Sequence, residues 1–381
     1  MKNAQVAVVG AGLSGLYAAY RLQQIGITDY VVLEARKEPG GRILTLSSAQ
    51  MTGAKLDDAV KTDFLDFGPS WFWPGYQVQL ARLVEALGLL QYEQHETGDM
   101  IVERSRHLPA LRVAGHRSSP ASMRIIGGMK ALTNALCSHL GQGCVHTGRL
   151  VHRIRRVEQG VELETRKADG SETTWTVDHV LLALPPRLVQ ASIDFSPALP
   201  ASLSLSWKQT ATWMAPHAKY FATYEPPFWR EQGLSGAGRS SIGPIAEVHD
   251  ASTPQGGAAL FGFIGVPATS RKALGEKELK ALCRAQLARM YGPSAAFPEA
   301  EFIKDWASDP LTAVEADWTA TDQHATAPPS VAESGQWVGH LMGVGSEWST
   351  RFPGYLAGAI DAVDQGVAQL QIQRQSVNAL I

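Results

Sequence analysis

The sequence predicts an α/β protein with two domains, and three observations support this prediction. The chain has 381 residues, which is more than one compact hydrophobic core usually contains. A strand-like run, "QVAVVG", is followed by the glycine-rich "GAGLSG" and then by apolar residues at helical spacing. A second strand-like run, "YVVLE", completes a strand–helix–strand unit, which is the building block of a parallel sheet.

The glycines of this unit predict a binding site for a dinucleotide. Gly10, Gly12 and Gly15 match G-x-G-x-x-G between the first strand and the helix, and Glu34 ends the second strand. The glycines permit a tight turn, close approach of the backbone to a pyrophosphate and close helix–strand packing. The first turn of the helix, which contains Ser14, offers free amide groups to phosphate. The acid can bind ribose hydroxyls, so we expect a Rossmann-like domain, although this pattern serves both NAD and FAD.

A second glycine pair distinguishes the two cofactors. In "LEARKEPGGRI", Gly40 and Gly41 allow close backbone approach, and Arg42 offers a planar fork of donors to phosphate oxygens. The stretch from Val8 to Ile43 resembles the N-terminus of the flavin-dependent amine oxidases, the family of monoamine and polyamine oxidases. The resemblance implies FAD, with Gly41 and Arg42 at the pyrophosphate and Arg36 near the adenosine.

Two segments further along the chain extend the resemblance. "LDFGPSWFWPG" is similar to a loop that runs under the isoalloxazine ring, which implies flavin contacts from Gly68, Ser70 and Trp71. Val151 matches a residue whose backbone touches the adenine. Without the resemblance, Val151 is an ordinary strand valine.

The remaining matches concern the reactive end of the flavin. "MGVGSEWSTRFPGYLAGA" resembles a C-terminal segment, which implies that Glu347 binds ribityl or ribose hydroxyls and that a helix opening near Gly354 and Tyr355 points at the flavin. Leu356 is a further implied cofactor contact. Lys219 lies nine residues before "FWR", where the family has a lysine that hydrogen-bonds a water beside flavin N5. Tyr355 also matches one of the two aromatic rings of the family's substrate cage.

The second ring of that cage has no direct counterpart. The matching segment falls near Glu315 or Ala316, where no aromatic residue occurs. Either Trp318 or one of Trp71 and Trp73 replaces it, or the cage is incomplete. The same segment carries the flavin-linked cysteine of the animal enzymes, and this chain has no cysteine after Cys283. We therefore expect FAD to be bound non-covalently.

The resemblance also implies how the chain divides. We expect a discontinuous FAD-binding domain of residues 1–76, 141–192 and 332–381, and an inserted α+β substrate-binding domain of residues 77–140 and 193–331.

Composition excludes several other classes of function. The net charge is −2, so neither nucleic acid nor an anionic membrane is expected as a partner. No apolar run reaches the ~18 residues of a membrane span. The three cysteines form no C-x-x-C pair, so neither a metal site nor a disulfide framework is expected, and the cytoplasm is the expected location. The oligomeric state stays open.

We therefore predict an FAD-dependent oxidoreductase that converts an amine C–N bond to an imine by hydride transfer to flavin N5, with O2 as acceptor and H2O2 as product. An L-amino-acid oxidase is the nearest alternative, with Arg104 or Arg106 as a carboxylate partner. A flavin-dependent desaturase and a non-catalytic flavin-binding protein are the others. A nicotinamide dehydrogenase would leave Gly40, Gly41 and Glu347 without a role.

Overall fold

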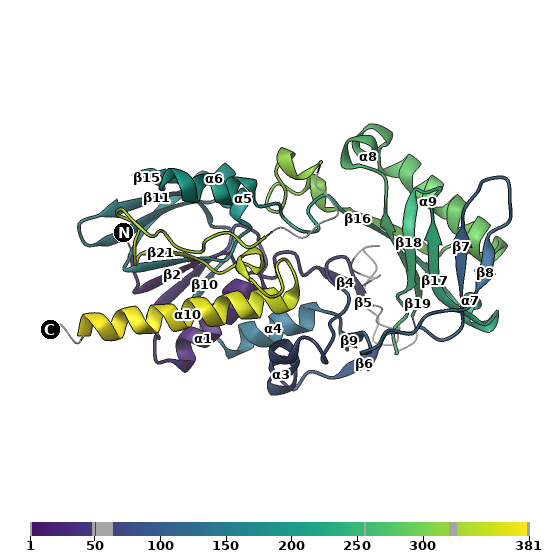
Figure 1. Cartoon of the computed structure of the whole chain (residues 1–381), viewed down its shortest axis with the longest axis horizontal. Helices are drawn as coiled ribbons and strands as arrows, with labels where there is room; N and C mark the ends of the chain where they lie inside the picture. The colour runs from purple at the N-terminus through teal and green to yellow at the C-terminus, as the bar shows by residue number, and fades with distance from the viewer. Residues whose placement is uncertain (1, 48–49, 51–63, 255–256, 320–325, 379–381) are drawn as a thin grey trace.

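The computed structural model describes residues 2–47, 50, 64–254, 257–319 and 326–378, whose strands form three large sheets and two small ones (Figure 1). The first large sheet is entirely parallel, in the order β10 (Val145–His146), β3 (Tyr30–Leu33), β2 (Val6–Val9), β14 (His179–Leu182) and β21 (Leu341–Gly343). Every residue of β2 and β3 is buried, as expected for strands covered on both faces. This sheet confirms the α/β fold and the predicted strand–helix–strand unit.

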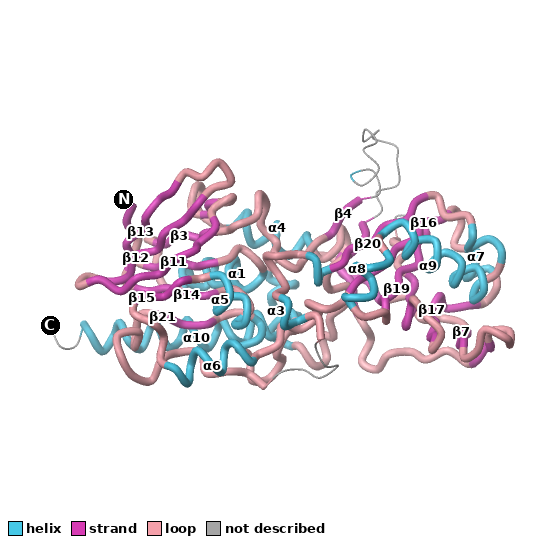
Figure 2. The backbone as a smooth tube through the Cα atoms, turned by 90° about the horizontal axis from the view of Figure 1, so that it is seen from above, coloured by secondary structure: helices cyan, strands magenta, loops and turns pink. Residues whose placement is uncertain are grey.

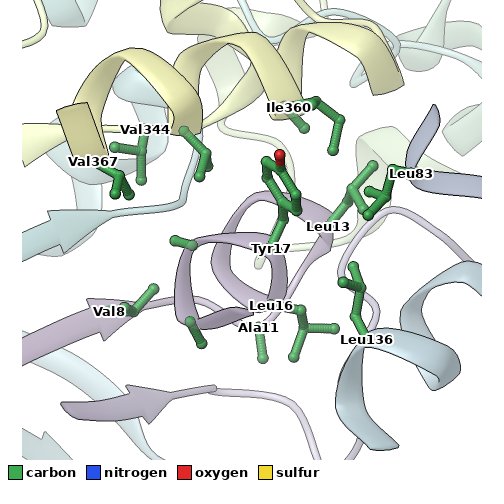
Figure 3. Packing of buried hydrophobic residues seen from close by; sticks show 14 of the residues in the cluster. Val8, Ala11, Leu13, Leu16, Tyr17, Leu83, Leu136, Val344, Ile360 and Val367 are labelled. Atoms are coloured by element: carbon green, nitrogen blue, oxygen red, sulfur yellow. The ribbon is translucent and has the colours of Figure 1, made fainter. Parts of the chain in front are cut away.

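Helices cover one face of the parallel sheet. They are α1 (Leu13–Gln24), α3 (Val78–Ala86), α4 (Lys130–His139) and α10 (Leu356–Asn378). Figure 3 shows Leu13 and Tyr17 of α1 directed toward α10, with Val8 of β2 and Leu136 of α4 on other sides of the same cluster. The Tyr17 hydroxyl also donates to Asp364 of α10 at 3.0 Å. The two ends of the chain are thereby packed into one core.

The second large sheet covers the opposite face of the parallel sheet. Its order is β1 (Lys2–Asn3), β13 (Glu172–Val177), β12 (Gly160–Arg166), β11 (Leu150–Val157) and β15 (Asp194–Ser196), and α5 (Pro186–Ser192) and α6 (Ala201–Gln209) pack beside it. Alternate residues of β2, Ala7 and Val9, face this second core. Strands β11 and β12 form a hairpin, and β13 follows it in the chain before the buried strand β14.

The third large sheet lies at the far end of the long axis of the molecule, as both views show (Figures 1 and 2). Its order is β20 (Ala300–Asp305), β16 (Ala218–Tyr224), β19 (Ala258–Ile264), β18 (Ile245–Asp250), β17 (Leu234–Ser240), β7 (Asp99–Glu103) and β8 (Leu111–Val113). Helix α9 (Glu276–Tyr291) packs on one face, against the even-numbered residues of β16 such as Tyr220. The odd-numbered residues, among them Lys219 and Phe221, therefore face the other way, toward the parallel-sheet part.

The shorter elements complete the described chain. The small sheets pair β4 (Thr45–Ser47) with β5 (Phe64–Asp66) and β6 (Gln91–Glu93) with β9 (Met123–Ile125). The other helices are α7 (Phe228–Glu231), α8 (Ala268–Leu274) and four 3₁₀ turns, Pro293–Ala296, Trp306–Ser308, Glu315–Asp317 and Ser346–Trp348.

The division into two domains stays a prediction. Helices α3 and α4, which fall in the range expected for the substrate-binding domain, contribute Leu83 and Leu136 to the core on the parallel sheet. Across the described part of the chain, no helix combines the length and the apolar character that crossing a membrane requires.

Candidate active site

One long cavity, with a volume of about 530 Å3, connects the parallel sheet to the seven-stranded sheet. Its lining begins at Val9 and Leu33, at the carboxyl ends of the central strands, and reaches Lys219 and Phe263 on the seven-stranded sheet. Ligands of doubly wound folds bind in this position, outside the carboxyl ends of the strands. The cavity contains every site residue that the sequence predicts except Gly15 and Glu347, and these two lie directly behind lining residues.

The glycine-rich turn has the geometry that the sequence predicts. A Cβ on Gly15 would lie 1.8 Å from the carbonyl oxygen of Gly10, so only glycine lets α1 approach the turn. Gly12 is the residue before α1 and has no side chain that could accept hydrogen bonds from the first turn of the helix. The amide groups around Ser14 are therefore available to a ligand. Gly41, at φ +58°, packs against Gly12 so closely that a Cβ on it would lie 3.1 Å from the Gly12 Cα.

Glu34 holds this turn from the side. One carboxylate oxygen accepts a hydrogen bond from the amide of Ala11 at 2.7 Å, and the other accepts from the amide of Arg36, also at 2.7 Å. The side chain is 5% exposed. Each oxygen keeps a second lone pair for a ribose hydroxyl, so Glu34 both organises the turn and faces the cavity.

Arg36 forms hydrogen bonds with Asp309 and Thr312 that the sequence does not predict, at the same end of the cavity. We call this group of three residues the Arg36 clasp. The guanidinium of Arg36 donates to both carboxylate oxygens of Asp309, at 3.0 and 3.1 Å, and to the hydroxyl of Thr312. Burial acts to raise the pKa of Asp309, but hydrogen bonds from Arg36 and Lys304 outweigh it and hold that pKa below its usual value. The clasp brings Pro310 to Thr312 over the end of the cavity lined by Glu34 and Val151.

Arg42 and Glu347 meet although 305 positions separate them. The guanidinium forms a bidentate pair with the buried carboxylate, at 2.5 and 3.1 Å, and also donates to the hydroxyl of Ser346. The resemblance implied a separate cofactor contact for each of these residues. The structure makes them partners, with Arg42 lining the cavity and Glu347 behind it.

The loop after β5 joins the two parts of the molecule. A Cβ on Gly68 would lie 2.0 Å from the carbonyl oxygen of Arg42, which explains the glycine by close backbone approach. Lys219 of β16 reaches this loop and donates to the carbonyl oxygens of Asp66 and Gly68, at 3.0 and 2.5 Å, and to the hydroxyl of Ser70 at 2.8 Å. Gly68, Ser70, Trp71 and Lys219 are thus brought together at the cavity.

The charge of Lys219 is strongly affected by its environment. The side chain is buried, and loss of hydration lowers its pKa from 10.5 to about 7, while Asp66 acts to raise the pKa and Arg124 to lower it. Its ammonium also lies 4.6 Å from the ring centre of Phe261. Lys219 therefore changes its charge near neutral pH.

Aromatic rings wall the cavity near Lys219. The lining includes Trp71, Trp73, Trp213, Phe263, Trp306 and Tyr355. Trp73 and Tyr355 meet edge to face, with ring centres 6.4 Å apart. Of the candidates for the second cage ring, Trp71 and Trp73 line the cavity, whereas Trp318 lies outside its lining, with its indole donating to Ala307 and covered by Lys272.

Trp213 is a lining ring that sequence reasoning missed. It stands beside Gly354, where a Cβ would lie 2.6 Å from the Trp213 Cβ. The next residue, Met214, also lines the cavity and has a positive φ of 64°, rare for a residue other than glycine. No motif surrounds this segment, so only the fold brings it to Tyr355.

The "FWR" motif has a structural role outside the cavity. Trp229 and Arg230 donate to the carboxylate of buried Asp250, at 2.8, 2.7 and 2.9 Å. The carbonyl of Asp250 accepts from the Gln94 amide, whose oxygen accepts from the Trp71 indole. The motif thus fixes the orientation of Trp71 through a chain of hydrogen bonds.

An acid, Glu247, lines the same end of the cavity. It lies in register with Phe263, which is in register with Lys219 on the next strand, so the three residues form one row across the sheet. A hydrogen bond from His249 and the charge of Arg239 lower the pKa of Glu247 against the effect of burial. The cavity therefore presents a carboxylate two strands, or about 10 Å, from the lysine backbone.

FAD fits the described lining. The close approach of Gly12 and Gly41 leaves backbone rather than side chains at the position for phosphates, and Arg42 supplies a cation beside it. Val151, in β11, and Leu356, at the start of α10, both belong to the lining. Among the described residues, no group of three His, Cys, Asp or Glu side chains is arranged for a metal ion.

Comparisons with known proteins indicate the family of the chain. A family model described as flavin-containing amine oxidoreductase matches residues 113–363, and a model of the NAD(P)-binding Rossmann-like domain matches residues 8–87. Putrescine oxidase from Kocuria rosea is 24% identical, over 81% of this chain and 83% of its own length. An L-amino acid dehydrogenase from Synechocystis is 28% identical, over 65% of this chain and 51% of its own.

A solved structure shows the same fold. Cyclohexylamine oxidase from Brevibacterium oxydans superposes with a TM-score of 0.78 at 20% identity, over 98% of this chain and 99% of that one. Because the first family model spans more than half of the sequence, the chain belongs to the flavin-containing amine oxidoreductases and is an FAD-dependent enzyme.

Proposed function

We propose that the protein oxidises the C–N bond of a small amine to an imine, with O2 as the electron acceptor and H2O2 as product. The observation that carries this proposal is the single cavity that runs from the dinucleotide turn to a buried lysine walled by aromatic rings. Bound FAD supplies the hydride acceptor.

The cofactor is held, in this proposal, by the residues that line the cavity from one end to the other. Gly10, Gly12, Ser14, Gly41 and Arg42 bind the pyrophosphate. Glu34, Arg36 and Val151 bind the adenosine, and Glu347 acts by orienting Arg42 as well as by any hydroxyl contact. Gly68, Ser70, Trp71, Tyr355 and Leu356 border the flavin ring.

The aromatic end of the cavity orients the substrate and excludes water. An apolar environment favours the neutral amine over its ammonium, and only the neutral amine has the nitrogen lone pair that assists loss of a hydride. Tyr355, Trp73 and Trp213 form the walls, and Tyr355 and Lys219 are the proposed catalytic residues. This assignment needs no acid–base triad.

Non-covalent binding of FAD and a cytoplasmic location are part of the proposal. The cysteines of the chain, Cys137, Cys144 and Cys283, are unpaired and do not belong to the cavity lining. Free thiols are typical of a reducing compartment.

One relative, the L-amino acid dehydrogenase from Synechocystis, favours the L-amino-acid oxidase alternative. The charges that line the cavity argue against it. Arg104 and Arg106 are exposed residues outside the cavity lining. In the described lining, the arginines are Arg36, Arg42 and Arg149, all at the cofactor end, whereas the substrate end carries Glu247. A carboxylate there repels an amino acid's own carboxylate.

Anaerobic mixing tests the proposal. The purified yellow protein is mixed with benzylamine, cyclohexylamine, putrescine, spermidine and L-leucine in turn, and the flavin absorbance is followed. Bleaching by amines, and recovery with H2O2 on admitting air, is the expected result. Bleaching by L-leucine alone would favour the amino-acid alternative, and no bleaching by any compound would favour a desaturase or a non-catalytic flavoprotein.

A further inference from the structure

The three hydrogen-bond partners of Lys219 differ in kind. Two are backbone carbonyls, of Asp66 and Gly68, which can only accept. The third is the hydroxyl of Ser70, which both donates and accepts. Ser70 is also a lining residue of the cavity, so the same side chain contacts the lysine nitrogen and borders the space proposed for the substrate.

This set of partners satisfies Lys219 in both protonation states. An ammonium donates one hydrogen bond to each carbonyl and one to Ser70. A neutral amine donates to the two carbonyls, and its lone pair accepts from the Ser70 hydroxyl. Only the direction of one hydrogen bond changes, so the lysine gains or loses a proton without moving.

Amines reach the enzyme mostly as ammonium ions, because an alkylamine has a pKa near that of free lysine, about 10.4. The nitrogen must lose a proton before its carbon can release a hydride. We propose that Ser70 relays this proton to Lys219, an inference that rests on the proposed amine oxidation. The substrate N–H bond breaks as its proton moves to the Ser70 oxygen, and the Ser70 hydroxyl proton passes to Lys219 Nζ. A neutral amine and a lysine ammonium result, so atoms and charge balance.

The relay lies among charged groups from four strands. Asp66 of β5 and Arg124 of β9 lie behind Lys219, and the carboxylate oxygen of Asp66 that faces Arg124 accepts no hydrogen bond, with 3.9 Å between the two side chains. Lys304 of β20 is in register with Lys219 but is neutralised by Asp309. Glu247 and His249 of β18 lie on the cavity face beyond Phe263.

These neighbours favour uptake of a proton from the cavity. The substrate ammonium is attracted by Glu247, and Asp66 favours the positive charge that the transferred proton brings to Lys219. Arg124 disfavours the positive charge of protonated Lys219. Lys219 can therefore release the proton again after each turnover.

The first test is the pH profile of flavin reduction in an anaerobic stopped-flow experiment. It uses the FAD-loaded enzyme and the panel amine that reduces wild type fastest. We expect Ser70→Ala to slow reduction by roughly 10- to 1,000-fold at pH 7 and by less than about twofold near pH 10, where the free amine is already neutral. Ser70→Thr keeps a hydroxyl and should stay within about threefold of wild type at all pH values.

Lys219→Met is the second arm, because it removes the final acceptor. It should reproduce the profile of Ser70→Ala, and the double variant should be no slower than either single variant. An unchanged profile for Ser70→Ala, or equal defects in Ser70→Ala and Ser70→Thr, would overturn the relay. Wild type that no amine reduces would instead overturn the proposed function.

A readout independent of activity is the titration of Lys219 by NMR of ¹³Cε-labelled lysine, with Lys219→Met to assign the signal. Loss of the Ser70 acceptor removes a charge-assisted hydrogen bond of the ammonium, so the pKa of Lys219 should fall by about 1 unit in Ser70→Ala and return in Ser70→Thr. If the pKa of Lys219 is the same in Ser70→Ala as in wild type, Ser70 does not bind the lysine, and the relay is overturned.

Discussion

Glu34 should stabilise the protein even before FAD binds. Its two oxygens accept from the amides of Ala11 and Arg36 inside the protein. In Glu34→Gln, the amide oxygen can accept one of these bonds, but the NH₂ group faces the other amide donor. The variant loses a charge-assisted hydrogen bond and leaves a buried N–H unsatisfied, which together cost about 2–4 kcal/mol.

The assay is thermal unfolding of the apoprotein, followed by an FAD titration of each variant. The unfolding entropy of a chain of 381 residues is about 0.8 kcal/mol/K, so the cost corresponds to a fall in Tm of about 3–5 °C. The Kd for FAD should also rise, because the turn proposed to bind phosphate is less ordered.

A matched control is Glu38→Gln, four positions along the chain from Glu34, which changes an exposed acid paired with Lys130. A surface pair of this kind contributes about 0–1 kcal/mol, so its Tm should move by about 1 °C at most. If the Glu34→Gln apoprotein has the same Tm as wild type while its affinity for FAD falls, Glu34 binds only the ribose. Its hydrogen bonds to the turn then do not stabilise the protein.

Three further predictions concern other parts of the cavity. The pKa of Lys219 is lowered to about 7 in the folded protein, so between pH 7 and 10.5 the unfolded chain binds one more proton than the folded one. The free energy of unfolding should therefore rise with pH in this range, by up to about 1.4 kcal/mol per pH unit. Urea titrations should show this slope in wild type and not in Lys219→Met. Asp309→Asn removes the ionic partner of Arg36 and should raise the Kd for FAD, measured by fluorescence titration, about 5- to 30-fold. The control Asp29→Asn, at an exposed position, should leave the Kd unchanged. If Asp309→Asn binds FAD as tightly as wild type, the pair of Arg36 and Asp309 does not retain FAD. Glu247→Gln removes the carboxylate of the substrate end and should raise the KM of a charged amine about 3- to 10-fold with kcat unchanged, and an unaltered KM would place the substrate away from β18.

The cofactor end was accessible to prediction because its chemistry is local. Gly10, Gly12, Gly15 and Glu34 lie within one strand–helix–strand unit, where backbone geometry follows directly from residue type and spacing. The Arg36 clasp was missed because Arg36 and Asp309, 273 positions apart, carry no shared motif. Its only signal in the sequence is an aspartate followed by proline.

The substrate end was predicted less well. Lys219 was found through its neighbours in "FWR", but those neighbours serve Asp250 rather than the cavity. The candidates for the missing cage ring were Trp318, Trp71 and Trp73. The structure brings Trp73 to Tyr355 and adds Trp213 beside Gly354, which the sequence did not indicate.

The sequence by itself determined the parallel sheet, the turn for phosphates and the choice of FAD, because each depends on residues close together in the chain and on what glycine and acid side chains can do. Tertiary structure alone decided which rings lie at Tyr355, that Glu347 pairs with Arg42, and that Lys219 donates a hydrogen bond to Ser70. These contacts join segments from opposite ends of the chain, and their positions depend on how the sheets pack. Burial then changed the chemistry of Lys219 itself, since the loss of water that lowers its pKa is a property of the folded interior and not of the residue.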